Sequence, residues 1–204
     1  MQTATWETLT GSENLLILAP GPGDESLIFG GLIARSCRRG RPPFVVVLTD
    51  GSATNPGSNA LNPDQLANLH ERETRAAARH LGLPVNRLLM AGLLDGTLPA
   101  EGPPFDAVVR GLTLIMWARD CNVICAPGPD SAPAEAIAAH RIAAAVAVRS
   151  GVGLLWGLTC LSRRTYGWRL DIAPELPAKR AAIAAHAALQ TIAEPTPHEA
   201  FIRP

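Results

Sequence analysis

Two adjacent acidic residues, Asp24 and Glu25, follow a short apolar segment and a Gly-Pro-Gly turn at residues 21–23. Carboxylates in such a loop can bind a metal ion through oxygen. They can equally stabilise the first turn of a helix, where the helix dipole favours negative charge. The two glycines allow a further use, because bare backbone N–H groups beside a helix N-terminus can hold an anion. The residues alone leave these uses open.

Further polar residues stand where later segments end or begin. Asp50 follows an apolar run and precedes Gly51, which is typical either of an Asx turn or of a ligand-binding residue at a strand end. Asp130 and Glu135 precede an alanine-rich helical segment, where they either line a pocket or cap the helix. His140 lies about one turn further on, as a replacement metal ligand or as a partly exposed helix residue.

The elements that position these residues alternate along the chain. Five apolar runs of strand length lie at 15–19, 44–49, 87–91, 122–126 and 152–158, and five helical patterns lie at 26–39, 64–81, 105–119, 134–149 and 175–189. Short connections between them favour the α/β class, with a Rossmann-like, mostly parallel β-sheet flanked by helices on both faces. In such folds ligands bind beyond the carboxyl ends of the strands.

The composition limits the class of protein and its partners. With 204 residues, 47% hydrophobic and 18% charged, the chain is expected to form one domain over residues 1–204, with residues 194–204 as a loosely ordered tail. Eighteen basic residues balance eighteen acidic ones, so neither a nucleic acid nor a membrane is expected as a partner. The first residues lack a signal-peptide pattern and the four cysteines form no C-x-x-C pair, so a cytoplasmic location is expected.

A family resemblance begins in the loop that holds Asp24. Residues 15–34 read LLILAPGPGDESLIFGGLIA, which resembles the A-H-P-D-D-E-S-x-x-x-G-G-x-I-A signature of the PIG-L/LmbE zinc-dependent N-deacetylases. Four later segments resemble other motifs of that family in the same order: LTDGSATNPGS, HERETRAAARHLGLP, GLLDG and LDIAPELPAKRAAIAAHAALQ. The chain thus resembles a compact bacterial member of the family over nearly its whole length.

The resemblance implies an enzyme that removes an N-acetyl group from a sugar or a related amide. In the family, two histidines and one aspartate hold zinc, and a neighbouring aspartate is the general base. At these positions the chain has Gly21 for the first histidine, Gly23 for the base and Asp24 for the aspartate ligand. The second histidine should come from a D-x-H-x-D-H motif, which falls on residues 130–135 and contains no histidine.

The resemblance also indicates residues that contact substrate. Asp95, in GLLDG, matches a residue that binds a substrate hydroxyl, and His70 falls where relatives have an arginine that contacts the sugar. Asp50 is a third candidate because it ends a strand at the ligand-binding edge. Glu73 and His186 match scaffold positions, and we expect His186 to be buried and bonded to a backbone carbonyl.

These positions predict a deacetylase-fold protein that is catalytically impaired or inactive and acts as a carbohydrate-binding or regulatory protein. Asp24 is then a vestigial metal ligand, and no cofactor is expected. The alternative is an active N-deacetylase with a metal site rebuilt around Asp24, in which Glu135 and His140 substitute for the lost ligands and zinc is the cofactor. The expected partners are a small sugar or amide ligand, and either an active relative or a second copy of the chain.

Overall fold

The computed structural model describes residues 2–11, 14–53, 61–129, 134–158, 167–188 and 195–203. Within them, eight strands form one sheet in the order β1-β7-β8-β6-β5-β2-β3-β4. The strands are β1 (Gln2–Ala4), β2 (Leu15–Ala19), β3 (Phe44–Thr49), β4 (Leu88–Leu93), β5 (Val123–Pro127), β6 (Gly153–Leu158), β7 (Trp168–Asp171) and β8 (His198–Ile202). The α-helices are α1 (Trp6–Thr10), α2 (Asp24–Arg38), α3 (Pro63–His80), α4 (Gly102–Ala118), α5 (Ala134–Ser150) and α6 (Leu176–Ala184), with short 3-10 turns at Val85–Arg87 and Ala173–Glu175.

The sheet is mostly parallel, as the alternation of segments predicts. Strand β2 pairs in parallel with β3 and β5, β3 with β4, β5 with β6, and β1 with β7. Among the strands of the described residues, only β8 runs antiparallel, between β6 and β7. Every residue of β2, β3 and β5 is buried, because helices cover both faces of these strands, and this explains their continuous apolar sequences.

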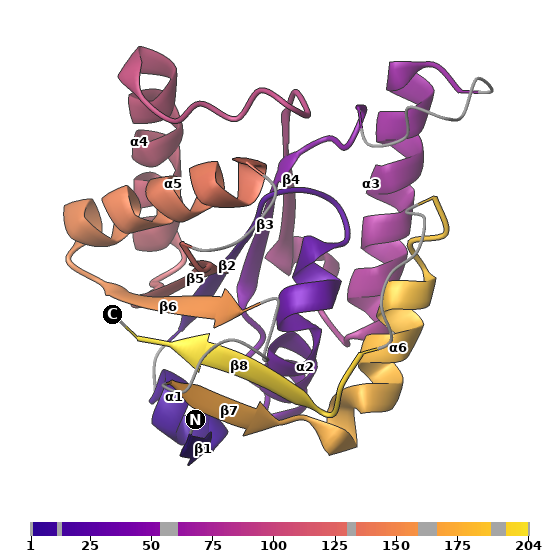
Figure 1. The fold of residues 1–204 in the computed structure, drawn as a ribbon, viewed down its shortest axis with the longest axis vertical. Helices are drawn as coiled ribbons and strands as arrows, with labels where there is room; N and C mark the ends of the chain where they lie inside the picture. Colours follow the sequence, from indigo (N-terminus) through magenta and orange to yellow (C-terminus); the bar gives the residue numbers. More distant parts are fainter. Residues whose placement is uncertain are drawn as a thin grey trace.

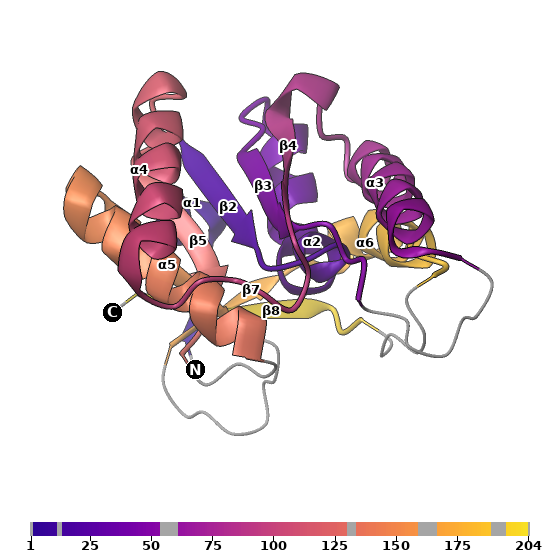
Figure 2. The ribbon, with the colours of Figure 1, turned by 90° about the horizontal axis from the view of Figure 1, so that it is seen from above.

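Helices form a layer on each face of the sheet. Figure 1 and Figure 2 show α2, α3 and α6 on one face and α4 and α5 on the other. One buried cluster joins the sheet to α2 through Phe29 and Leu32, and the opposite cluster joins it to α4 and α5 through Met116 and Ile142. The α/β, Rossmann-like fold class is therefore confirmed. No helix among the described residues is long and apolar enough to cross a membrane.

Strand β8 corrects the expectation of a loosely ordered tail at residues 194–204. Residues 198–202 are largely buried and lie inside the sheet between β6 and β7. This strand also brings Glu199 against the middle of α2, where its carboxylate accepts hydrogen bonds from the N–H groups of Gly31 (2.6 Å) and Leu32 (2.9 Å). Lys179 of α6 donates a third hydrogen bond to Glu199 at 2.6 Å, and both side chains are less than 5% exposed.

Candidate functional site at the carboxyl edge of the sheet

The loop between β2 and α2 is shaped by Gly23. Its φ of +92° lies in the left-handed region, and this turn places Asp24 and Glu25 in the first turn of α2. Neither carboxylate makes the usual N-cap bond; each folds back on the loop instead. Asp24 Oδ2 accepts a hydrogen bond from the Gly21 N–H at 3.1 Å and stays partly exposed. Burial raises the pKa of Asp24 to about 7, against the lowering effect of the Gly21 N–H, and the nearby charges of Glu25 and Glu135 add to the increase.

Glu25 is a buried scaffold residue with several partners. Its carboxylate accepts hydrogen bonds from the Gly23 N–H at 2.8 Å and from the Ser26 hydroxyl at 2.7 Å. His186 Nε2 lies 2.9 Å from Glu25 Oε1. His186 is buried, as expected, but its partner is this carboxylate and not a backbone carbonyl. Burial alone would lower the pKa of His186, but the hydrogen bond and charge of Glu25 raise it above its usual value.

The loops after β3 and β4 are tied together by two aspartates. Asp50 Oδ1 accepts hydrogen bonds from the Ser52 N–H at 2.9 Å and from the Asp95 N–H at 3.2 Å. Asp95 Oδ2 in turn accepts one from the Ala53 N–H at 3.0 Å. Asp50 therefore forms the expected Asx turn and also joins the neighbouring loop through the Asp95 N–H. Its ligand-binding role stays a prediction.

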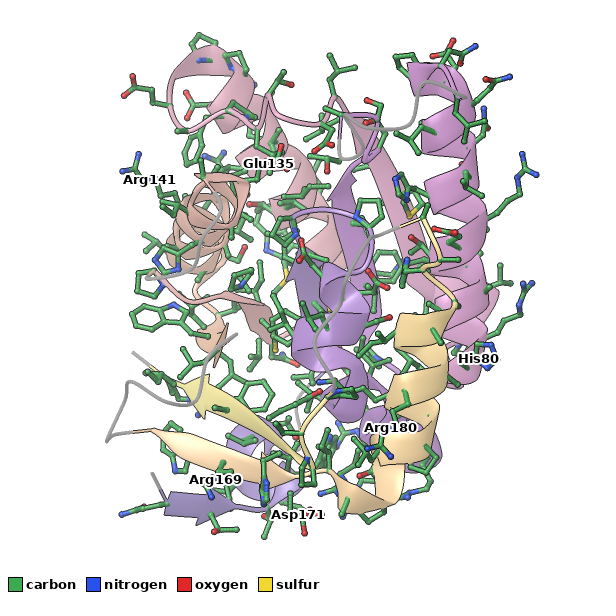
Figure 3. The ribbon with its side chains drawn as sticks, turned by 45° about the vertical axis from the view of Figure 1, so that its right-hand side comes forward. His80, Glu135, Arg141, Arg169, Asp171 and Arg180 are labelled. Atoms are coloured by element: carbon green, nitrogen blue, oxygen red, sulfur yellow. The ribbon has the colours of Figure 1, made fainter. Side chains whose placement is uncertain are left out.

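Glu135, in the first turn of α5, joins these loops from the other side of the sheet. Its Oε1 accepts a hydrogen bond from the Gly96 N–H at 2.6 Å, and Figure 3 shows its side chain at the upper end of the sheet. The pKa of Glu135 is raised to about 7, first by burial, then by a hydrogen bond with the side chain of Asp95 and by the charges of Asp95 and Asp50. We call Asp24, Asp50, Asp95 and Glu135 the carboxyl-edge cluster.

A cleft of about 420 Å³ extends from Asp50 along α3. The cleft was missed by the sequence analysis, although Asp64, Asn68 and Glu71 have the i, i+4, i+7 spacing that puts polar side chains on one helix face. Its described lining contains three carboxylates and no basic side chain. The lining residues are Asp50, Asp64, Ala67, Asn68, Glu71, Met90 and Gly92.

Comparison of the sequence with models of protein families identifies the family of this chain. The family model for GlcNAc-PI de-N-acetylase matches residues 16–149, which is more than half of the chain. The chain belongs to the PIG-L family. No curated protein matches it.

Solved PIG-L-like structures share the fold at low sequence identity. N,N'-diacetylchitobiose deacetylase from Pyrococcus horikoshii superposes with a TM-score of 0.71 at 21% identity, over 88% of this chain and 71% of that one. Teicoplanin deacetylase Orf2, in a zinc-inhibited form, gives 0.67 at 17% identity, over 86% and 84%. GalB, a 4-carboxy-2-hydroxymuconate hydratase from Pseudomonas putida, gives 0.74 at 14% identity, over 93% and 95%. Deacetylases and a hydratase thus share the fold, so the fold alone does not fix the reaction.

At Gly21, where the resemblance places a zinc-binding histidine, the chain has no side-chain donor. A Cβ atom added to Gly21 would lie 3.1 Å from Thr49 Oγ1 and 3.9 Å from Asp24 Oδ2, so a larger side chain at this position would contact Thr49. In the part of the chain that the structure describes, no group of three or more His, Cys, Asp and Glu side chains is arranged to hold a metal ion. Asp130 and the rest of residues 130–133 lie outside that part.

His140 and His70, both proposed from the sequence as site residues, contact neighbouring protein groups. His140 Nδ1 lies 3.2 Å from the Pro127 carbonyl oxygen, and its ring packs edge-on against Trp156 with centroids 5.2 Å apart. Burial lowers the pKa of His140.

His70 has no exposed surface, and its Cδ2 lies 2.9 Å from where a Cβ of Gly51 would be. Among the described residues neither of its ring nitrogens has a hydrogen-bond partner, although Nδ1 lies 3.6 Å from Glu73 Oε2. In this arrangement His70 supports the Asp50 loop and does not line the cleft.

Proposed function

We propose that this PIG-L protein binds a hydroxyl-bearing, sugar-like ligand at the carboxyl-edge cluster and does not hydrolyse amides by the family's zinc mechanism. The observation that carries the proposal is the pair of glycines in the β2–α2 loop. Gly21 and Gly23 stand where the family has a zinc ligand and a general base, and Asp24 bonds the Gly21 N–H. The protein then acts as a carbohydrate-binding or regulatory protein.

The size of the expected catalytic loss supports this proposal. A positioned general base contributes about 10²–10⁴-fold to a reaction rate. Removing even a residue that only orients a metal ligand typically costs about 10–100-fold in metal affinity or activity. Gly21 lacks a ligand altogether and Gly23 lacks the base, so both steps of the family reaction lose their protein groups.

The remaining groups are suited to binding hydroxyls. A carboxylic acid near its pKa exists partly as a donor and partly as an acceptor, and Asp24 and Glu135 both have a pKa of about 7. Asp50 and Asp95 add acceptor oxygens at the same edge. A ligand with several hydroxyls can satisfy such a set, and the chitobiose deacetylase of similar fold acts on an acetylated sugar.

One observation favours the alternative of an active N-deacetylase rebuilt around Asp24. Glu135 lies close enough to Asp24 for its charge to raise the pKa of Asp24. Two carboxylates are one ligand short of the three protein ligands of a catalytic zinc site. The alternative therefore needs a third ligand, either His140 or one from residues 130–133.

Zinc content and hydrolysis of N,N'-diacetylchitobiose by the purified protein separate the two functions. We expect far less than one zinc per chain and no acetate release. We expect zinc binding only in the double variant Gly21→His with Glu135→His, and its loss again when Asp24→Ala is added. Gly23 is left unchanged, because a side chain at its φ of +92° costs about 1–3 kcal/mol of strain. Stoichiometric zinc together with acetate release by the unaltered protein would overturn the proposal.

A further inference from the structure

The two helix layers of the molecule differ in what they expose to solvent. Among the described residues, eight large hydrophobic side chains are exposed, and four of them lie on α4 and α5: Leu114, Trp117, Ile137 and Val148. None of the eight lies on α2, α3 or α6, which cover the opposite face of the sheet in Figure 2. The outer surface of the α4–α5 layer is therefore the more apolar of the two.

The sequence of α4 accounts for much of this apolar surface. Only Asp106 and Arg110 are charged among its 17 residues, whereas α3, of similar length, contains eight Asp, Glu, Arg and His residues. The inner face of α4 already packs on β2 and β3 through Val109, Leu112 and Met116. A helix that is apolar on its outer side as well is normally buried on both sides, so the outer side of α4 lacks a partner in the single chain.

The outer side of α4 has a pattern against which a second helix can pack. Ala107, Gly111, Leu114 and Ala118 are all exposed, and they are spaced by four, three and four residues, which is the spacing of a helix–helix seam. Open space lies beside Gly111, because a Cβ atom added there would meet nothing within 4 Å. The small residues on either side of Leu114 allow the backbone of a second helix to approach closely.

Arg110 and Trp117 make this side of α4 complementary to a copy of itself. They are seven residues apart, so they lie about 10 Å from each other along the same side of the helix. Arg110 is exposed and has no ion-pair partner within the described part of the chain, and Trp117 is 62% exposed. When two copies of α4 lie antiparallel about an axis midway between these residues, each Arg110 is level with the partner's Trp117. An arginine over a tryptophan ring is an attractive cation–π contact.

We propose that this protein forms a two-fold symmetric homodimer in which α4 packs antiparallel against α4 of a second copy. The axis passes near Leu114, so the two Leu114 side chains meet in the middle of the interface and two pairs of Arg110 and Trp117 flank them. Such an arrangement uses the same surface on both copies and closes on itself. The cleft lies along α3 on the opposite face of the sheet, so the dimer goes beyond the proposed function and does not depend on it.

The polar residues of α4 favour a second protein chain over a lipid surface. A helix that lies in a membrane interface is usually rich in lysine and arginine on its polar face, whereas Arg110 is the only basic residue within α4. The match between Arg110 and Trp117 across a two-fold axis further favours a second copy over an unrelated protein, because both halves of the contact are present on one surface.

Sedimentation velocity over a range of protein concentrations tests the dimer. We expect the unaltered protein to sediment as a dimer and to dissociate on dilution. Trp117→Arg removes the indole and places a second positive charge opposite the partner's Arg110, so the dissociation constant should rise about thirtyfold or more. Because Trp117 is mostly exposed in the single chain, the variant should keep the circular dichroism and melting temperature of the unaltered protein.

An exchange of the two residues identifies both the partner and the register. The double variant Arg110→Trp with Trp117→Arg restores the contact only if position 110 of one copy faces position 117 of the other. Its dissociation constant should therefore return to within about threefold of that of the unaltered protein. Leu61→Arg is the control, because it adds the same charge at another exposed apolar side chain, just before α3 on the other face of the sheet, and it should leave the dimer unchanged.

Each other outcome overturns the inference. A monomer at every concentration excludes the dimer, and a monomer that binds phosphatidylcholine vesicles with a blue shift of Trp117 fluorescence assigns this face to a membrane. A dimer that Trp117→Arg leaves intact, or that Leu61→Arg weakens equally, has its interface elsewhere. A loss in Trp117→Arg that the double variant does not recover excludes the antiparallel pairing about Leu114.

Discussion

Two pairs of carboxylates in this molecule differ in how completely the protein satisfies them. Glu25 and Glu199 are buried and each has three partners: two neutral donors and His186 for Glu25, and two backbone N–H groups and Lys179 for Glu199. Asp24 and Glu135 are partly exposed: Asp24 accepts a hydrogen bond from the Gly21 N–H, and Glu135 accepts one from the Gly96 N–H and also interacts with the Asp95 side chain. The first pair links distant parts of the fold, whereas the second pair accepts fewer hydrogen bonds and lies at the edge of the sheet.

The difference also shows in the charges that face each pair. Glu199 lies against the ammonium of Lys179, and Glu25 against His186, whose pKa it raises. Asp24 and Glu135 lie nearer to other carboxylates, and burial raises the pKa of both to about 7. Burial and the neighbouring carboxylates both disfavour the charged forms of Asp24 and Glu135 in the folded protein.

The largest effect is expected at Glu199. Glu199→Gln leaves the Lys179 ammonium buried without a countercharge, so the free energy of unfolding should fall by about 3–5 kcal/mol. Urea denaturation measures this change. The double variant Lys179→Met with Glu199→Gln should recover part of the loss, because it removes the unpaired charge. A loss below about 1 kcal/mol in Glu199→Gln would show that Glu199 contributes little to stability and would contradict its contrast with Asp24 and Glu135.

A smaller effect is expected at Glu25. Glu25→Gln keeps an oxygen for the Gly23 N–H but removes the charge opposite His186, and we expect a loss of about 1.5–3 kcal/mol. The raised folded-state pKa of His186 means that this stabilisation is full below the unfolded pKa and is lost as pH rises through the folded pKa. Urea denaturation at pH 6 and pH 9 should therefore show a larger difference from the unaltered protein at pH 6. An equal difference at both pH values would contradict the His186 pairing.

The smallest effect, of opposite sign, is expected in the cluster. A carboxyl whose pKa rises to about 7 on folding binds more protons when folded, so stability is lost as pH rises from about 4 through 7. Asp24→Asn and Glu135→Gln remove this loss while keeping an acceptor oxygen. At pH 8 each should stabilise the protein by on the order of 1–2 kcal/mol, and by less at pH 5. Thermal unfolding at the two pH values measures the change in stability of each variant. A variant that is destabilised at pH 8 would show that its charged carboxylate stabilises the fold.

Long apolar elements could be predicted from the sequence, whereas short and charged ones could not. The strands at 15–19 and 44–49 were predicted to the residue, because every position is apolar or β-branched and a proline or aspartate follows. Strand β1, helix α1 and strand β7 were missed, because three to five residues are too few to show a period. Strand β8 contains Glu199, and only the distant Lys179 explains how that charge can be buried.

The site was predicted residue by residue but not as a set of contacts. Asp24, Asp50, Asp95 and Glu135 were each named from strand ends and family motifs, and the structure brings them to one edge. The pairing of Glu25 with His186 spans 161 positions, and no local pattern reveals a contact at that separation. The metal-ligand role considered for His140 gains no support, because its contacts with Pro127 and Trp156 arise only when β5, β6 and α5 pack together.

The place of β8 in the sheet has a consequence for the order in which the chain can assemble. Within the part of the chain that the structure describes, β1 pairs with β7 alone, with Gln2 opposite Trp168, and β7 is joined to the other strands through β8. Since synthesis runs from the N-terminus, β1 leaves the ribosome long before the two strands that anchor it. Five neighbouring strands of the sheet (β4, β3, β2, β5 and β6) can pair first. Strands β8, β7 and β1 are then added at the β6 edge, and joining β1 to β7 closes a long loop at a high cost in entropy.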